Sequence, residues 1–254
     1  MFNYDFLHEI RKYEFGVVEL LIPKEKKILE IGGGNGFQAR CFSDKGYQVE
    51  SIDIEKSNFK QHEFFPVKIY DGLNIPFPDD SFDIVFSSNA LEHVRNLKYL
   101  NKEIKRVLKS EGECIHILPS TVWRFWTIVT HYLEFFIRLN KEISRLIKPS
   151  LSLDTIKNKI NIFILILRII KSYLLVPVHG EIGNSITEII TFNRFFWWIL
   201  FKRMQFSIKK IYPSDLFYTG HMIFGKKLSI KNRTKISNYF GSACNIFVLK
   251  NIKF

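Results

Sequence analysis

A short apolar run that leads directly into a glycine-rich loop constrains the fold of this chain more than any other feature. The run occupies residues 27–31, and Gly32, Gly34 and Gly36 follow it, ahead of a helix-like segment over residues 37–45. A strand that breaks into a glycine loop and then a helix is how open α/β sheets let a ligand approach. Glycine is needed because the backbone must turn sharply and a Cβ would keep the ligand away. The pattern predicts an α/β sheet with a ligand site at this loop.

The spacing of the glycines distinguishes between classes of cofactor. Dinucleotide-binding folds use G-x-G-x-x-G, whereas residues 30–36 of this chain read E-x-G-x-G-x-G. No Lys-Ser or Lys-Thr pair comes directly after the last glycine, as it does in a Walker motif, which argues against a nucleoside triphosphate site. The segment resembles motif I of the class I S-adenosylmethionine (SAM) methyltransferases, in which the loop passes beneath the methionine part of the cofactor. The resemblance implies that SAM is the cofactor.

Two further segments match this family in chain order. Residues 47–54 alternate like a strand and contain Asp53, at the position where the family places a carboxylate on the ribose hydroxyls. Residues 67–73 read as a third strand, and the resemblance puts Asp71 near the adenine amino group.

Polar candidates also follow the fourth expected strand, residues 82–88. Asn89 and His93 belong to a segment, Asn-Ala-Leu-Glu-His, that stands where the family often reads Leu-Glu-His. Both are expected at the cofactor pocket, and His93 is either a wall of that pocket or a catalytic group. Glu30 is either a cofactor ligand or a structural acid, and the cofactor role is preferred. Asp83, at the start of this strand, is expected to be structural.

The resemblance extends over about residues 26–120. A helix over residues 97–108 is expected to end at a turn in which Gly112 supplies the C-cap, and a fifth strand is expected over residues 114–118. These segments specify SAM binding well, but they say little about the methyl acceptor.

Composition sets the outer limits of the interpretation. A chain of 254 residues with 46% hydrophobic residues can form one α/β domain with an insertion. Its three cysteines are isolated, so neither a metal site nor a disulfide framework is predicted. Together with an N-terminus that lacks a signal-peptide pattern, this favours a reducing, cytoplasmic location, either free or peripheral on the inner face of the membrane.

The net charge of +12 is concentrated in the second half of the chain. Residues 1–120 hold 16 Lys and Arg against 19 Asp and Glu, whereas residues 121–254 hold 21 against 6. Such asymmetry indicates an anionic partner for the basic half.

Residues 121–185 read as a helical, aromatic-rich insertion that is both basic and apolar. Its longest uncharged run in the second helix-like piece, residues 160–167, is far shorter than the roughly 18 to 20 apolar residues of a membrane span. Contact with an anionic membrane surface is the preferred interpretation, and a buried cap on the core or a surface for a partner protein are the alternatives. Nucleic acid is not expected as the partner, because Ile, Leu and Phe dominate the insertion.

The residues after the insertion supply the catalytic and acceptor-binding candidates. His179 and Glu181 lie in a polar loop that returns over the cofactor, and either is a candidate general base; the alternative is that the loop only caps a helix over residues 186–204. Tyr218 and His221 are candidate substrate contacts in a second polar and aromatic cluster.

The remaining segments complete the expected fold. A sixth strand over residues 206–213, a helix over residues 229–240 and a final strand over residues 245–250 complete a Rossmann-like, seven-stranded, mostly parallel α/β sheet with helices on both faces. We expect a single domain, with a SAM-binding core in residues 1–120, the cap insertion in residues 121–185 and the completion of the sheet in residues 186–254.

The arrangement of the second half is loosely similar to that of bacterial methyltransferases of surface-polysaccharide or lipid-linked glycan synthesis. It implies a small or lipid-linked acceptor, with a sugar hydroxyl as the methylated group. The alternatives are methylation of another membrane lipid or an isoprenoid quinone, and a non-catalytic membrane-surface protein on the same scaffold. The sequence does not predict the oligomeric state.

Overall fold

A seven-stranded sheet forms the centre of the molecule. The computed structural model describes residues 4–54, 63–147, 153–181, 183–222 and 224–252. The strand order is β3-β2-β1-β4-β5-β7-β6. The strands are β1 (Lys27–Ile31), β2 (Gln48–Ile54), β3 (Lys68–Tyr70), β4 (Phe82–Ser88), β5 (Leu108–Pro119), β6 (Phe206–Pro213) and β7 (Cys244–Asn251).

The sheet is mostly parallel, as predicted. The β1–β2, β1–β4, β2–β3 and β4–β5 pairs are parallel, and β7 runs antiparallel to both β5 and β6. The carboxyl ends of β1, β2 and β4 therefore meet at one edge of the sheet, where a ligand site is expected in open α/β folds.

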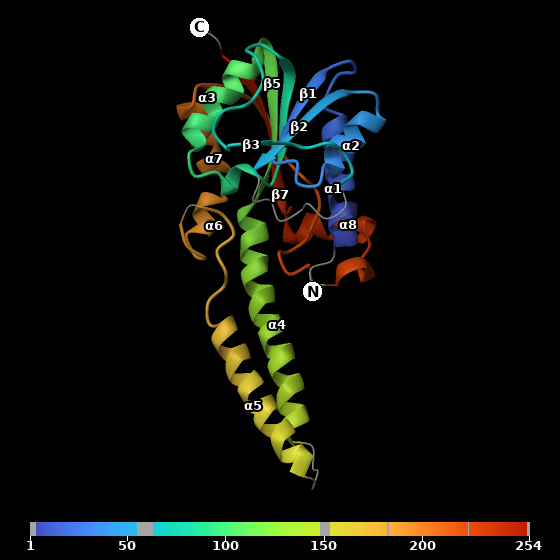
Figure 1. The fold of residues 1–254 in the computed structure, drawn as a ribbon, viewed down its shortest axis with the longest axis vertical. Helices are drawn as coiled ribbons and strands as arrows, with labels where there is room; N and C mark the ends of the chain where they lie inside the picture. The colour runs from blue at the N-terminus through green and yellow to red at the C-terminus, as the bar shows by residue number, and fades with distance from the viewer. Residues whose placement is uncertain (1–3, 55–62, 148–152, 182, 223, 253–254) are drawn as a thin grey trace.

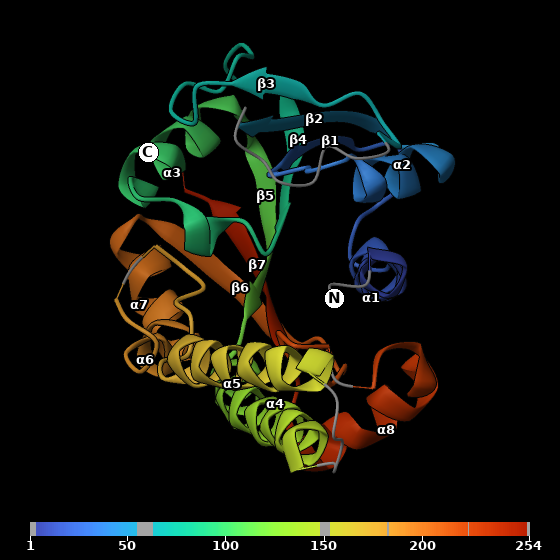
Figure 2. The ribbon, with the colours of Figure 1, turned by 60° about the horizontal axis from the view of Figure 1, so that its bottom comes forward.

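Helices cover both faces of the sheet (Figure 2). The helices α1 (Tyr4–Glu19), α2 (Phe37–Asp44) and α8 (Ile230–Phe240) belong to one apolar cluster, and α3 (Leu97–Val107) and α7 (Arg194–Arg203) belong to the other. In α3 the buried apolar positions recur at a spacing of three and four residues, which is the pattern of a helix that packs by one face; they are Leu97, Leu100, Ile104 and Val107.

Two sequence predictions about element boundaries were wrong. The helix α3 ends at Val107 and Leu108 already has extended backbone, so β5 starts at Leu108 and Gly112 lies within the strand instead of capping the helix. The helix expected over residues 186–204 is divided into α6 (Glu188–Thr191) and α7, because Asn193 has extended backbone and its side chain caps the new helix by accepting from the Phe195 amide at 2.8 Å.

The insertion is a two-helix hairpin that stands away from the sheet (Figure 1). Its helices are α4 (Thr121–Ile147) and α5 (Leu153–Tyr173), which pack against each other. The base of the hairpin, where Trp123 and Thr127 are buried, packs on the core, and the rest of the hairpin projects from it. Among the residues that the structure describes, neither these helices nor any other is long and apolar enough to cross a membrane.

Candidate functional site

The glycine loop connects β1 to α2 at the carboxyl edge of the sheet. Gly32 and Gly36 have φ values of 77° and 76°, a left-handed conformation that side chains rarely adopt. A Cβ on Gly32 would lie 2.5 Å from the Cβ of Ala90, and a Cβ on Gly36 would lie 2.5 Å from the carbonyl oxygen of Phe65. Gly34, at a φ of 58°, shares this conformation. The loop is therefore packed closely against Ala90 and Phe65, and the approach of a ligand to it stays a prediction.

Asp53 lies in β2 and reaches the glycine loop of the neighbouring strand. Its Oδ2 accepts a hydrogen bond from the Gly34 amide at 2.7 Å, and its Oδ1 accepts one from the Ile54 amide at 2.7 Å. These bonds fix a half-buried carboxylate beside the loop, where each oxygen keeps a lone pair for a further donor. Its contact with the ribose hydroxyls stays a prediction.

Glu30 is buried beneath the same loop. Its Oε2 accepts a hydrogen bond from the Ser51 hydroxyl at 2.6 Å, and both groups lie directly under Gly33, where a Cβ would approach them to 2.8 and 2.0 Å. Burial raises the pKa of the Glu30 carboxyl to about 7, against the lowering effect of the Ser51 hydrogen bond. Glu30 thus supports the loop from below, and direct contact with the cofactor stays a prediction.

The raised pKa of Glu30 predicts how stability depends on pH. Because this pKa is higher in the folded than in the unfolded chain, the stabilisation is present at low pH and is lost as the pH rises through about 7. Between pH 4 and pH 8, the free energy of unfolding of the wild type should fall by about 3 kcal/mol relative to that of Glu30→Gln. Urea unfolding at a series of pH values measures this difference, and parallel curves for the two proteins would contradict it.

Asp71 and Asn89 lie at the ends of β3 and β4, as predicted. The exposed Asp71 carboxylate accepts from the backbone amides of Leu73 and Asn74, which lowers its pKa and makes the residue the organiser of a turn. Asn89 has a φ of 50°, a conformation that asparagine tolerates better than most residues. Its backbone amide donates to the Ile117 carbonyl. Their contacts with SAM stay predictions.

The structure brings His93 and His179 together around the buried carboxylate of Glu92. The Nε2 atoms of His93 and His179 lie 3.9 and 3.8 Å from Glu92 Oε1, and the two ring centroids are 4.8 Å apart. The histidine side chains are 42% and 36% exposed, whereas that of Glu92 is 1% exposed. Burial lowers the pKa of His93. The site therefore joins two solvent-accessible imidazoles to one buried acid.

Hydrogen bonds hold the loop of His179 against the segment after β4. The amide of Glu181 donates to the Glu92 carbonyl at 2.9 Å. The amides of His179 and Gly180 donate to Glu188 Oε1 at 2.7 and 2.6 Å. Glu188 in turn forms a buried ion pair with Arg124 at the base of the hairpin, at 2.9 Å. The loop therefore joins the hairpin to the edge of the sheet.

Glu181 is a weaker candidate base than His179. Its exposed carboxylate pairs with Arg95 at 2.7 Å, and this hydrogen bond lowers its pKa. The structure thus separates the two catalytic candidates of the sequence: His179 lies beside Glu92 and His93, and Glu181 faces an arginine.

Sequence reasoning missed Glu92, Glu188 and Arg124 as members of the site. Glu92 stands beside His93 in the matched segment, so its position was visible, but nothing in the sequence shows its burial or its proximity to His179, 87 residues later. Glu188 and Arg124 lie among apolar residues near the two ends of the insertion. Because they are far apart in the chain, no local spacing pattern indicates that they form a pair.

The structure corrects the substrate prediction for Tyr218. Its side chain is buried, and its hydroxyl lies 3.0 Å from both Glu14 Oε1 and Cys244 Sγ. Burial raises its pKa well above the ordinary value. Tyr218 therefore belongs to a polar network in the core.

His221 contacts α4 of the hairpin. Its Nδ1 lies 3.2 Å from Glu134 Oε2, and its ring centroid lies 5.3 Å from that of His131. The described contacts of His221 include none with His93 or His179, so a role in substrate binding stays a prediction.

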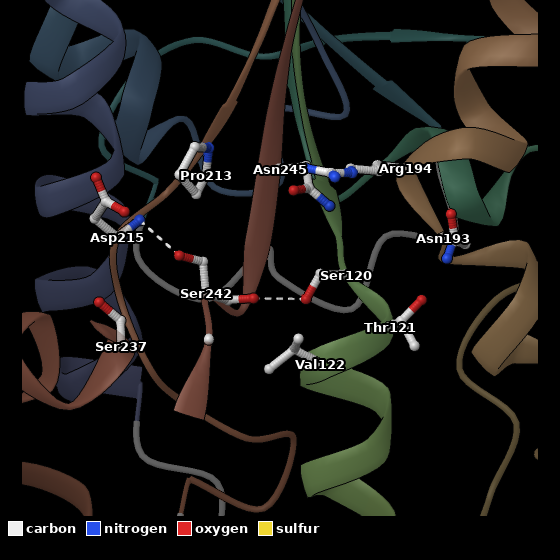
Figure 3. Close-up of a pocket in the computed structure, with 11 residues that line it drawn as sticks. Ser120, Thr121, Val122, Asn193, Arg194, Pro213, Asp215, Ser237, Ser242 and Asn245 are labelled. Atoms are coloured by element: carbon white, nitrogen blue, oxygen red, sulfur yellow. Dashed lines mark hydrogen bonds between the residues drawn. The ribbon is translucent and has the colours of Figure 1, made fainter. Parts of the chain in front are cut away.

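A hollow of about 410 Å³ lies at the base of the hairpin, where β5, β6 and β7 meet α4 (Figure 3). The Ser120 hydroxyl donates to the Ser242 carbonyl across it at 2.6 Å, and the Asp215 amide donates to the Ser242 hydroxyl at 3.1 Å. None of the predicted cofactor or catalytic residues lines this hollow, so it shares no residue with the predicted SAM site.

Part of the chain is similar in sequence to known methyltransferases. Residues 29–116 match the family model of the methyltransferase domain. An uncharacterised methyltransferase of Mycobacterium avium is 36% identical over 106 residues, which are 39% of this chain and 40% of that protein. An uncharacterised methyltransferase of Mycobacterium tuberculosis H37Rv is 37% identical over 109 residues, 40% and 41% of the two chains. The chain thus spans about two fifths of the length of these relatives.

Solved structures extend the likeness to the whole fold. A SAM-dependent methyltransferase of Aquifex aeolicus superposes with a TM-score of 0.52 at 12% identity, covering 99% of this chain and 100% of that one. A SAM-dependent methyltransferase of Mesorhizobium loti superposes with a TM-score of 0.53 at 13% identity, covering 94% and 97%. Residues 29–116 therefore resemble a methyltransferase domain, and the whole chain has the fold of SAM-dependent methyltransferases, whose cofactor is SAM.

Proposed function

We propose that the protein transfers the methyl group of SAM to a small or lipid-linked acceptor, and that the acceptor atom is a sugar hydroxyl in cell-surface glycan synthesis. The observation that carries the proposal is the proximity of His93 and His179. His93 follows β4, which lies next to β1 in the sheet, and β1 leads into the glycine loop. Methylation of a hydroxyl requires a base close to the bound SAM, at the same edge of the sheet.

The reaction needs little covalent chemistry from the protein. The acceptor oxygen forms a bond to the methyl carbon as the carbon–sulfur bond breaks, and the electron pair of that bond converts the sulfonium into a thioether. The hydroxyl proton passes to His179, the candidate base with an accessible ring and no competing arginine. Positioning of the two reactants supplies most of the rate.

The hairpin supports the lipid-linked form of the acceptor. Large apolar side chains stay exposed along both helices, and those of Phe136 and Phe163 are 57% and 54% exposed. Lys141, Arg145 and Lys171 lie on the same hairpin. Exposed aromatic and aliphatic bulk beside basic residues is typical of helices that lie in the interface of an anionic bilayer. We infer that the hairpin holds the enzyme on such a surface.

Removal of two exposed aromatic side chains from the hairpin should weaken membrane binding. Each large apolar side chain contributes about 1.5 to 3 kcal/mol when fully buried, so partial insertion of both predicts that Phe136→Ser with Phe163→Ser lowers binding by about tenfold or more. Flotation with vesicles that contain anionic phospholipid measures the partition coefficient. Tyr239→Ser is the matched control, because Tyr239 is 88% exposed and belongs to α8 rather than to the hairpin.

Equal flotation of the wild type and the double variant would contradict a membrane-binding hairpin. If the wild type fails to float and sediments as a dimer that the double variant loses, the exposed apolar surface is instead an interface between two copies.

Radiolabelled methyl transfer tests the proposed function directly. The protein is incubated with labelled SAM and an extract of the source cells, which is then separated into lipid-linked, soluble small-molecule, RNA and protein pools. Label is expected in the lipid-linked pool, and His179→Ala should lower its rate of appearance by about 100-fold or more, whereas Glu181→Gln should change it little. Label in RNA or protein, or no label in any pool, would overturn the proposal.

The same experiment separates the alternative acceptors. Methylation of a carbon atom in a quinone needs no strong base at His179, so label that persists in His179→Ala favours that chemistry. SAM binding without any labelled product favours a non-catalytic protein.

A further inference from the structure

The carboxylate of Glu92 has an unusual environment for a buried acid. Its side chain is 1% exposed, and neither Oε1 nor Oε2 has a hydrogen-bond partner within the described part of the chain. An ionised carboxylate is costly to bury unless a positive charge or hydrogen-bond donors compensate for the lost water. The two nearest ion-pairing groups are the imidazoles of His93 and His179. The buried acid therefore points toward a place where positive charge is expected.

The three side chains have the donor atoms and spacing of a metal site. Each offers one ligand atom, and these atoms all lie within 4.8 Å of one another. Three ligands at about 2.0 to 2.1 Å from a tetrahedral ion lie about 3.3 Å apart. The separations of 3.8 and 3.9 Å from Glu92, and the largest separation of up to 4.8 Å, shorten to this value through rotation of the exposed rings. We propose that Glu92, His93 and His179 bind one divalent transition-metal ion.

The donor set indicates the class of ion. Two imidazole nitrogens and one carboxylate oxygen favour Zn²⁺, Co²⁺, Fe²⁺ or Mn²⁺ over Mg²⁺ and Ca²⁺, which prefer sites built only from oxygen atoms. Three protein ligands leave a coordination position open. Since both rings are partly exposed, that position is accessible from solvent at the edge of the sheet.

The backbones of the ligands are held in place by other contacts. The Glu181 amide donates to the Glu92 carbonyl, and Glu188 Oε1 accepts from the His179 amide. The ring of Trp123 lies 4.6 Å from the ring of His179. Supporting contacts of this kind orient ligands and strengthen metal binding. The site thus has fixed backbones and adjustable rings.

The metal site deepens the proposed function. Binding of the ion does not depend on that function, whereas a catalytic role of the ion rests on it. When bound, such an ion supplies a Lewis acid to an acceptor oxygen in the open position. In the loaded protein His179 is a ligand, and in the metal-free protein it is the candidate base. Binding of the ion can be measured with neither SAM nor acceptor present, which separates the two roles.

A titration with Co²⁺ tests the site. The full-length protein is stripped with a chelator, dialysed and titrated while the visible ligand-field absorption of Co²⁺ is recorded. We expect one saturable Co²⁺ per chain, displaced by Zn²⁺ and not by Mg²⁺. Glu92→Gln and His179→Ala should each weaken binding by at least about 100-fold, beyond the 10- to 100-fold typical for supporting residues. His221→Ala, which alters another imidazole–carboxylate pair, should leave binding unchanged.

Thermal melting controls for misfolding of the variants. In chelator, Glu92→Gln should melt no lower than the wild type, because the substitution removes an uncompensated buried charge. Excess Co²⁺ should raise the melting temperature of the wild type alone. Absence of stoichiometric Co²⁺ binding, or binding that survives both ligand substitutions, would overturn the proposal. If SAM binding and methyl transfer persist in that case, the metal site fails and the proposed function stands.

Discussion

Asp53→Ala is expected to lower the affinity of the protein for SAM by about 100-fold or more. Asp53 is fixed beside the glycine loop by the amides of Gly34 and Ile54, at 2.7 Å each. A carboxylate that accepts from two ribose hydroxyls contributes two charged hydrogen bonds, each of about 1.5 to 3 kcal/mol. Isothermal titration calorimetry with SAM measures the loss.

Two matched variants make this expectation specific. Asp53→Asn keeps an oxygen for one donor but removes the charge, so a smaller loss of about tenfold is expected. Asp44→Ala alters an exposed acid of α2 whose partner, Arg40, is equally exposed, and it should leave SAM affinity unchanged. Wild-type affinity in Asp53→Ala, with the fold intact by circular dichroism, would contradict the assignment of the cofactor site.

The half of the chain around Asp53 was predictable because its signals are local. The glycine loop needs a special backbone at Gly32 and Gly36, and only glycine meets that need without strain, so the sequence shows the turn itself. Short, largely apolar runs such as residues 27–31 then identify the parallel strands, which are buried on both faces. The order of these strands follows from the family resemblance.

The hairpin was predicted in composition but not in shape. The sequence shows apolar helices with basic residues, and such helices can either fold over a core or stand away from it. Their position depends on long-range packing at the base of the hairpin, where Arg124 of α4 pairs with Glu188 beyond α5. Periodicity within one helix carries no information about such a contact.

Loss of the Glu188 charge is expected to have the largest effect on stability. Its ion pair with Arg124 is almost completely buried, with side chains 0% and 1% exposed. Breaking a buried pair by removal of one partner typically costs about 3 to 5 kcal/mol, because the other charge stays uncompensated. Glu188→Gln should lower the free energy of unfolding in urea by this amount.

The double variant Glu188→Met with Arg124→Met distinguishes the lost charge from lost packing. Since it leaves no uncompensated charge, it should be more stable than Glu188→Gln. Glu111→Gln, which breaks the exposed pair with Lys250, is the control and should change stability by less than about 1 kcal/mol. A Glu188→Gln protein as stable as this control would contradict the role of the pair.

The same substitution should also reduce methyl transfer more than SAM affinity. Glu188 Oε1 accepts from the amides of His179 and Gly180, so it holds the candidate base against the segment after β4. The glycine loop and Asp53 lie on other strands and share none of these bonds. At a temperature where Glu188→Gln stays folded, we therefore expect a fall in kcat with an unchanged dissociation constant for SAM. An equal loss of both would mean that the substitution disturbs the whole sheet edge, and that Glu188 acts on the fold rather than on the position of His179.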